Sequence, residues 1–164
     1  MRMDKLEFTN LTNYIFGSTA AIITNTSLIV GMGTAGTGKG PILGGLLTIA
    51  LADNISDSLG IHMYKEAEGH GAKLSLLATV LNFTSRLLVS LSFVAIVLML
   101  SISQAIPAAV VWGLLLLILI SYLITRRNRA SGASAVLEMS RHVLVAVIVI
   151  AVSRYSGYLI ARYF

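Results

Sequence analysis

The stretch "PILGGLLTIALADNISDSLGIHMY", residues 41–64, is apolar over most of its length yet carries two carboxylates, Asp53 and Asp57. A helix that crosses a membrane needs about 20 predominantly apolar residues, and this stretch is long enough. The four-residue spacing places both carboxylates on one face of such a helix. The stretch therefore predicts a membrane span with negative charge on one face.

The rest of the chain has the same apolar character. Hydrophobic residues make up 56% of the 164 residues, charged residues 12%, and the mean hydropathy is +0.85. Such a composition is typical of proteins that reside in lipid. Pro107 is expected in the first turn of the fourth span. The sequence predicts an all-α integral membrane protein, a single transmembrane domain over residues 1–164 built as a five-transmembrane-helix bundle with spans at 13–34, 41–64, 74–102, 106–124 and 137–163.

Basic residues are unevenly distributed over the expected loops. On the positive-inside rule this asymmetry predicts a cytoplasmic N-terminus and a C-terminus on the opposite side. The expected location is the cell membrane, or a vacuole-type membrane in a eukaryote. The asymmetry explains the net charge of +5 without a nucleic-acid partner. The cytoplasmic group is Arg2, Lys5, Lys65, Lys73, Arg126, Arg127 and Arg129, with Arg141 near the boundary, and the opposite group is Lys39 and Arg162.

Four charges lie well away from the ends of the predicted spans: Asp53, Asp57, Arg86 and Arg154. A charge at the centre of a membrane helix costs about 2.5 to 3.5 kcal/mol even on insertion scales, so these residues should face inward and be paired. Arg86 and Arg154 are the expected counter-ions. At about 1.5 Å per residue, Asp53 and Arg86 both lie about 17 Å from the cytoplasmic ends of their spans. Depth thus favours an Asp53–Arg86 pair and leaves Asp57 free for a cation or a proton.

Weaker candidates for metal-binding and path residues lie before and after the two carboxylates in the sequence. His62 and Glu66, four residues apart, would gather a metal at the cytoplasmic mouth, unless this segment is simply a solvated loop. Thr24 and Asn25 would lend oxygens to a permeation path, although such residues also bond between membrane helices. The chain has no cysteine, and no nucleophile–base pair is readable, so we expect no enzyme and no cofactor.

The segments "FGSTAAIITNTSLIVGMGTAG" and "ALADNISDSLG" resemble the first two helices of the vacuolar iron transporter family. The resemblance implies a homodimer that exports divalent iron or manganese from the cytosol in exchange for protons, with the first two helices bordering the transport path. The chain departs from the family at Ala20 and Ala21, where an Asp–Gly pair is usual, and at Asp57, where a methionine lines the metal path. The matching positions are Phe16, Gly17, Thr24 and Gly31, then Ala52, Asp53, Ser56 and Gly60.

Two functional hypotheses follow from these residues. Oxygen ligands suit manganese and ferrous iron, and two carboxylates that repel each other would let one carry a proton, which would couple metal and proton movement. The partners would be the lipid bilayer, a divalent metal ion, protons and a second copy. The alternative is a transport-inactive or differently specialised relative whose Asp and Arg residues form structural ion pairs, or an interaction subunit of a membrane complex. The transport hypothesis assigns Asp53, Asp57, His62 and Glu66 to the metal and Thr24, Asn25 and Ser56 to the path.

Overall fold

The computed structural model describes residues 2–127 and 132–164, with side chains described from Tyr14 onward within the first helix. Arg129 and the side chains of Arg2 and Lys5, which entered the orientation count, lie outside the described residues. All elements of the described part are helical: α1 (Arg2–Thr34), α2 (Lys39–Thr48), η1 (Ile49–Asp53), α3 (Asn54–Ala67), α4 (Ala72–Met99), α5 (Ile102–Arg127) and α6 (Ala133–Tyr163).

The expected number of spans is confirmed by helix length and composition. Because α2, η1 and α3 are continuous, they form one long helix with a π-helical turn in its middle. Pro107 was wrongly placed in a first turn: α5 begins at Ile102, where Ser101 Oγ donates to Gln104 Oε1 at 2.9 Å, so the proline lies inside the helix. Five helices are long and apolar enough to cross a membrane: Tyr14–Thr34, Lys39–Ala67, Ala72–Met99, Ile102–Arg127 and Ala133–Tyr163.

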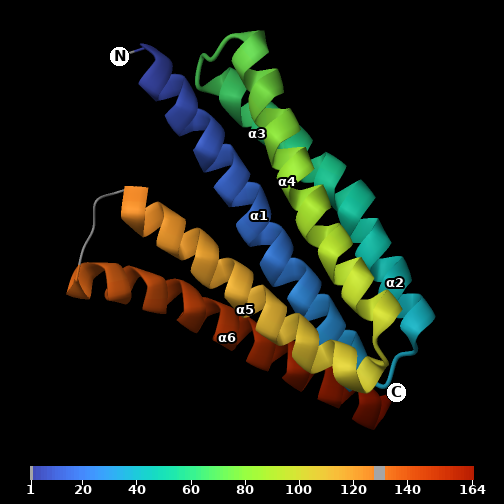
Figure 1. Cartoon of the computed structure of the whole chain (residues 1–164). Helices are drawn as coiled ribbons and strands as arrows, with labels where there is room; N and C mark the ends of the chain where they lie inside the picture. The colour runs from blue at the N-terminus through green and yellow to red at the C-terminus, as the bar shows by residue number, and fades with distance from the viewer. Residues whose placement is uncertain (1, 128–131) are drawn as a thin grey trace.

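Helix α1 is the centre of the bundle, in contact with α4, α5 and α6. The long helix α2–η1–α3 packs along α4, on the other side of the bundle from α6 (Figure 1). We call the end that holds Phe164 and the α4–α5 connection the C-terminal end, and the end where α3 joins α4 the loop end. The helices converge at the C-terminal end, and α5 and α6 diverge from the others toward the opposite end (Figure 1).

The course of α5 follows from the spacing of its buried residues. These recur every four residues, and each such step turns about 40° around an α-helix, so the buried line winds around α5 along its length. Near the C-terminal end it faces the main core, and toward the other end it faces α6, where Ser121 Oγ lies 3.0 Å from His142 Nδ1. The buried residues are Ala105, Ala109, Gly113, Leu117, Ser121 and Thr125.

The main hydrophobic core lies at the C-terminal end, where α1, α2, α4 and α5 meet. Toward the loop end, the buried face of α4 becomes polar, with serines, Asn82 and Arg86 in place of aliphatic side chains. Lipid is as apolar as leucine, so packing of small residues and hydrogen bonds between helices must hold this half together. The core residues are Ile29, Ile42, Leu46, Phe93, Val94, Val97, Ala105 and Ala109.

The π turn keeps one face of the long helix against α4. Positions four apart advance by about 40° in an α-helix, so a line of buried residues at that spacing would rotate away from its neighbour. A π turn holds more residues per turn than an α turn and takes back part of that rotation. The buried positions before, in and after the turn are Ile42, Leu46, Ala50, Asn54 and Ser58.

Two glycines set the distance between α1 and its neighbours. A Cβ at Gly17 would lie 2.5 Å from Ser85 Oγ and 2.7 Å from Asn82 Oδ1, so α1 and α4 touch there. At Gly157 a Cβ would overlap the Gly31 carbonyl oxygen and lie 3.0 Å from Thr34 Cβ, where α6 crosses α1. Close approach of this kind is the usual role of small residues between membrane helices.

We therefore expect Gly157→Ala to destabilise the protein by about 1 to 3 kcal/mol, because backbone atoms of α1 cannot move aside as a side chain would. Thermal unfolding in detergent measures the effect. Gly40→Ala is the matched control, because a Cβ at Gly40 meets nothing within 4 Å and alanine favours a helix. Equal stability of the two variants would show that α6 does not cross α1 at Gly157.

Candidate functional site

Arg86 of α4 is the centre of a buried ion-pair cluster. Its side chain is 2% exposed, Nη2 donates a hydrogen bond to Asp53 Oδ2 at 2.6 Å, and Nη1 forms an ion pair with Asp57 Oδ2 at 2.6 Å. Arg86 Nε has no hydrogen-bond partner among the described residues. We call Asp53, Arg86 and Asp57 the triad.

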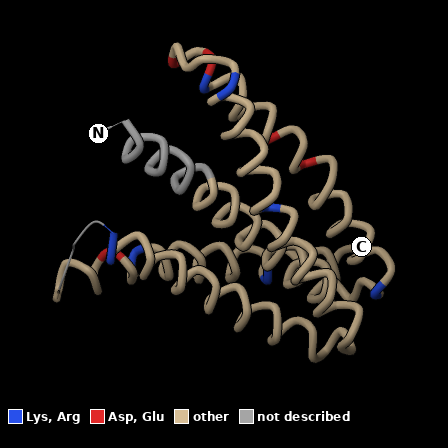
Figure 2. Tube along the Cα trace, turned by 45° about the horizontal axis from the view of Figure 1, so that its top comes forward, with Lys and Arg blue, Asp and Glu red and all other residues tan. Residues whose placement is uncertain are grey.

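The two carboxylates reach Arg86 because of where they lie on the long helix. Asp53 ends the π turn and Asp57 lies in the first turn of α3, so the two share the face toward α4. Asp53 is 14 residues from Lys39 and 14 from Ala67, which puts it about 21 Å from either end of this helix. Figure 2 shows that charged residues gather mainly near helix ends, so a charged cluster at this depth stands apart.

The expected Asp53–Arg86 pair is confirmed, but the expectation that Asp57 is free was wrong. Counting depth along the helices treated arginine as a point at its Cα. The guanidinium instead presents several N–H donors, and its nitrogens reach carboxylates that are one helical turn, about 5.4 Å, apart. One arginine therefore engages both carboxylates.

The triad has two negative charges and one positive charge, so it carries one excess negative charge. The Asp53 and Asp57 side chains are 45% and 44% exposed, whereas Arg86 is almost fully covered. Each carboxylate contacts the arginine through its Oδ2 atom. The uncompensated charge is thus accessible from outside the chain, which is the chemistry needed to bind a cation or a proton.

A polar ladder that the sequence reading missed continues from the triad toward the loop end. Asn82 Nδ2 donates to Ser58 Oγ at 3.1 Å, and Asn54 Nδ2 donates to the Phe83 carbonyl at 2.9 Å. Asn54, Ser58 and Asn82 are buried. Asn82 and Arg86 are four residues apart, as are Asp53 and Asp57. This shared spacing could have predicted that polar residues of the two helices face each other.

The expected path residues do not line a single route within the chain. Asn25 is fully buried and donates to Ser90 Oγ at 2.9 Å, so it bonds α1 to α4. Thr24 is half-buried, whereas Ser56 is exposed and donates to the Ala52 carbonyl of its own helix at 3.1 Å. Asn25 therefore acts here as a bond between helices.

His62 and Glu66 do come together near the loop end, with His62 Nε2 3.3 Å from Glu66 Oε1. His62 Nδ1 also lies 3.1 Å from Thr79 Oγ1 of α4. Over the described ranges 2–127 and 132–164, no three His, Cys, Asp or Glu residues gather as a metal site. One chain thus supplies two separate pairs, His62 with Glu66 and Asp53 with Asp57.

Glu68, the next carboxylate, is engaged by its neighbours. Lys65 Nζ donates to Oε2 at 2.8 Å and Tyr64 Oη donates to Oε1 at 2.7 Å. These bonds, that from Lys65 first, hold the pKa of Glu68 below its ordinary value of 4.5. Their contribution to stability is therefore present above the unfolded pKa and is lost as the pH falls through the lower folded pKa.

Arg154 was expected to be the second counter-ion of the carboxylates, but it contacts neither Asp53 nor Asp57. It is exposed on α6 and has no hydrogen bond or ion pair among the described residues. Both carboxylates pair with Arg86 instead. The expectation overlooked that one buried arginine can serve both.

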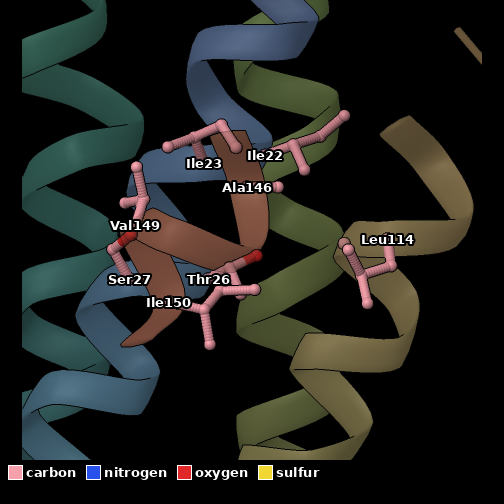
Figure 3. Close-up of a pocket in the computed structure, with 9 residues that line it drawn as sticks. Ile22, Ile23, Thr26, Ser27, Leu114, Ala146, Val149 and Ile150 are labelled. Carbon is pink, nitrogen blue, oxygen red and sulfur yellow. The ribbon is translucent and has the colours of Figure 1, made fainter. Parts of the chain in front are cut away.

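Two hollows of the described part of the chain lie away from the triad. A cavity of about 10 Å³, close to the smallest that can hold one water molecule, lies between α1, α5 and α6, lined by Thr26 and Ser27 among aliphatic side chains (Figure 3). A depression of about 650 Å³ between α4 and α5 is apolar apart from Ser92 and Trp112, whose indole N–H donates to the Ser92 hydroxyl. Neither has the groups to hold a metal ion.

Fold and site together define an all-helical protein with five helices suited to a membrane and a charged cluster at mid-helix. No family model, curated protein or solved structure matches the chain.

The geometry predicts non-additive costs at the triad. Asp53→Asn or Asp57→Asn alone leaves one carboxylate on Arg86, whereas the double variant strands a buried cation at about 3 to 5 kcal/mol. The loss of stability in the double variant should exceed the sum of the losses in the two single variants. Adding Arg86→Met to the double variant should restore much of that stability. Thermal unfolding in detergent measures all four variants.

The control is Glu66→Gln with Glu68→Gln, because exposed ion pairs contribute at most about 1 kcal/mol. Strictly additive losses at Asp53 and Asp57, with no recovery on removal of Arg86, would contradict the shared pairing.

Proposed function

We propose that the chain carries divalent iron or manganese out of the cytosol in exchange for protons, as a homodimeric member of the vacuolar iron transporter family. The observation that supports this most is the excess negative charge of the triad, half-exposed at the middle of a long apolar helix. An uncompensated carboxylate at that depth has a high free-energy cost, so its presence indicates a function.

The triad offers a mechanism for exchange. Arg86 neutralises one carboxylate, and the remaining negative charge can be met by a proton or by a divalent cation, but not by both at once. The donor atoms are oxygens, which suit manganese and ferrous iron better than soft metals. Competition for one charge would couple metal movement in one direction to proton movement in the other.

A second copy would complete the site. A stripe of small residues runs along the exposed side of the long helix, beside the carboxylates, and a Cβ at Gly44 or Gly60 would meet nothing within 4 Å. Small residues at four-residue spacing let two membrane helices approach closely. Packing of this stripe against its copy would cover the carboxylates and bring in further oxygens. The stripe is Gly44, Thr48, Ala52, Ser56 and Gly60.

A second candidate function also has an observation in its favour. Arg86 contacts both carboxylates, as expected if the triad only fastens α3 to α4 in a transport-inactive relative or a subunit of a membrane complex. The two candidates differ in what the excess charge does, so removing that charge alone separates them.

Asp57→Asn removes the excess charge and leaves the Asp53–Arg86 pair neutral, so the variant should fold. In proteoliposomes with an imposed proton gradient, we expect its manganese or ferrous iron uptake to fall at least about tenfold, the equivalent of about 1.4 kcal/mol. A pH-sensitive dye records the coupled proton flux, which should disappear with it.

Ile55→Val, an uncharged change at an exposed position two residues away, should keep wild-type uptake. Uptake that survives intact in Asp57→Asn would remove the triad from the transport mechanism. Wild-type uptake no higher than in empty vesicles, with either metal, would favour the structural candidate.

The dimer proposal can be tested with single cysteines, because the chain has none of its own. We expect Ala52→Cys to form an intermolecular disulfide on mild oxidation in membranes, since Cα atoms within about 7 Å can be bridged. Ala151→Cys, exposed on α6, is the control and should form no intermolecular disulfide. Cross-linking of Ala151→Cys alone would place the contact on α6 instead.

A further inference from the structure

The last part of α6 carries a basic and aromatic face that the triad does not explain. Arg154, Tyr158 and Arg162 follow at four-residue spacing, and all three are exposed. Arg162 Nη1 donates to Tyr158 Oη at 3.2 Å, which aligns two of the three groups. We call these residues the Arg154 face.

This face points out of the bundle. In α6 only Ala146 and Gly157 are buried, and Gly157 lies on the side toward α1. The Arg154 guanidinium has no acceptor among the described residues. Arg154 lies ten residues before Phe164, so its Cα is about 15 Å along the helix from the C-terminal end. A long arginine side chain spans part of that depth by turning toward the membrane surface.

Among the side chains that the structure describes, no Asp or Glu lies as close to the C-terminal end as that face. Asp53 is the acidic residue nearest the C-terminal end, and it is about 21 Å along its helix from Lys39. A second copy in the same orientation offers the same residues at the same depths. The seven acidic residues are Asp4, Glu7, Asp53, Asp57, Glu66, Glu68 and Glu138.

We propose that the Arg154 face binds the phosphodiester group of an anionic phospholipid in the leaflet at the C-terminal end. Lipid phosphates lie at the boundary of a hydrocarbon core about 30 Å thick, the level that the two arginines bracket. Guanidinium groups form strong, charge-assisted hydrogen bonds with phosphate oxygens, and Tyr158 adds a hydroxyl. The acyl chains would lie on Val147 and Ala151, which precede Arg154 on the same exposed side of α6.

This inference does not depend on metal transport, because it concerns a helix that lacks the triad. It explains why a charged residue lies within an apolar helix with so little protein around it. It also predicts a preference for lipids with negatively charged headgroups, which an ordinary lipid-facing helix would not show.

The test places an environment-sensitive fluorophore on Ala151→Cys, the only cysteine of that variant, in phosphatidylcholine vesicles. A minor fraction of the lipid is doxyl-labelled phosphatidylglycerol or, in parallel, doxyl-labelled phosphatidylcholine. We expect phosphatidylglycerol to be enriched about tenfold at the fluorophore, as judged by quenching, because two charge-assisted bonds favour it.

Arg154→Gln with Arg162→Gln should abolish the enrichment. Arg126→Gln with Arg141→Gln removes the same charge at the opposite end, from exposed positions, and should leave it unchanged. Circular dichroism checks that all variants fold.

Equal quenching by the two lipids in the wild-type background, or equal loss in both double variants, would overturn the proposal. Dissociation of a dimer by Arg154→Gln, with lipid preference unchanged, would also overturn it by assigning Arg154 to a protein partner.

Discussion

The buried guanidinium of Arg86 is the constraint on which the arrangement of α3 and α4 depends. A buried cation is stable only when opposite charge is within reach, and both carboxylates come from the adjoining helix. The polar ladder of Asn54, Ser58 and Asn82 runs beside this cluster and fixes the same two helices. The charge of one residue thus determines which face of the long helix is turned inward.

The two ends of the bundle are held together by different forces. At the C-terminal end, Phe93 and aliphatic side chains from four helices form a close-packed core. Toward the loop end, Gly17 lets α1 approach α4, and Asn25 and Ser90 bond these helices to each other. Polar groups that are satisfied only by one another have a unique partner geometry, so this half is specified by hydrogen bonds more than by shape.

The number of the spans and their approximate positions were predictable from the sequence, because an apolar run of membrane length has few alternatives to a helix. The Asp53–Arg86 pair was predictable as well, because depth can be counted along a helix. The Arg86–Asp57 contact depends on the reach of the arginine side chain and on the π turn. The spacing of apolar residues in the stretch 41–64 does not predict that turn. The exposure of Arg154 was equally hidden, since it depends on which helices cover α6.

The π turn has a consequence for the length of the chain. It accommodates an extra residue between Thr48 and Asn54, so deleting one residue there would let an unbroken α-helix form. The two parts would then keep nearly the same rotation relative to each other, because each residue of a π turn advances the helix by less than the 100° of an α-helix residue and the turn as a whole absorbs one residue. Ile42 and Leu46 would keep their places in the core, and the carboxylates would stay on the side of Arg86. An inserted residue within an unbroken α-helical part would instead turn one set of contacts away from α4, so the π turn is the place where this helix can change its length and keep both.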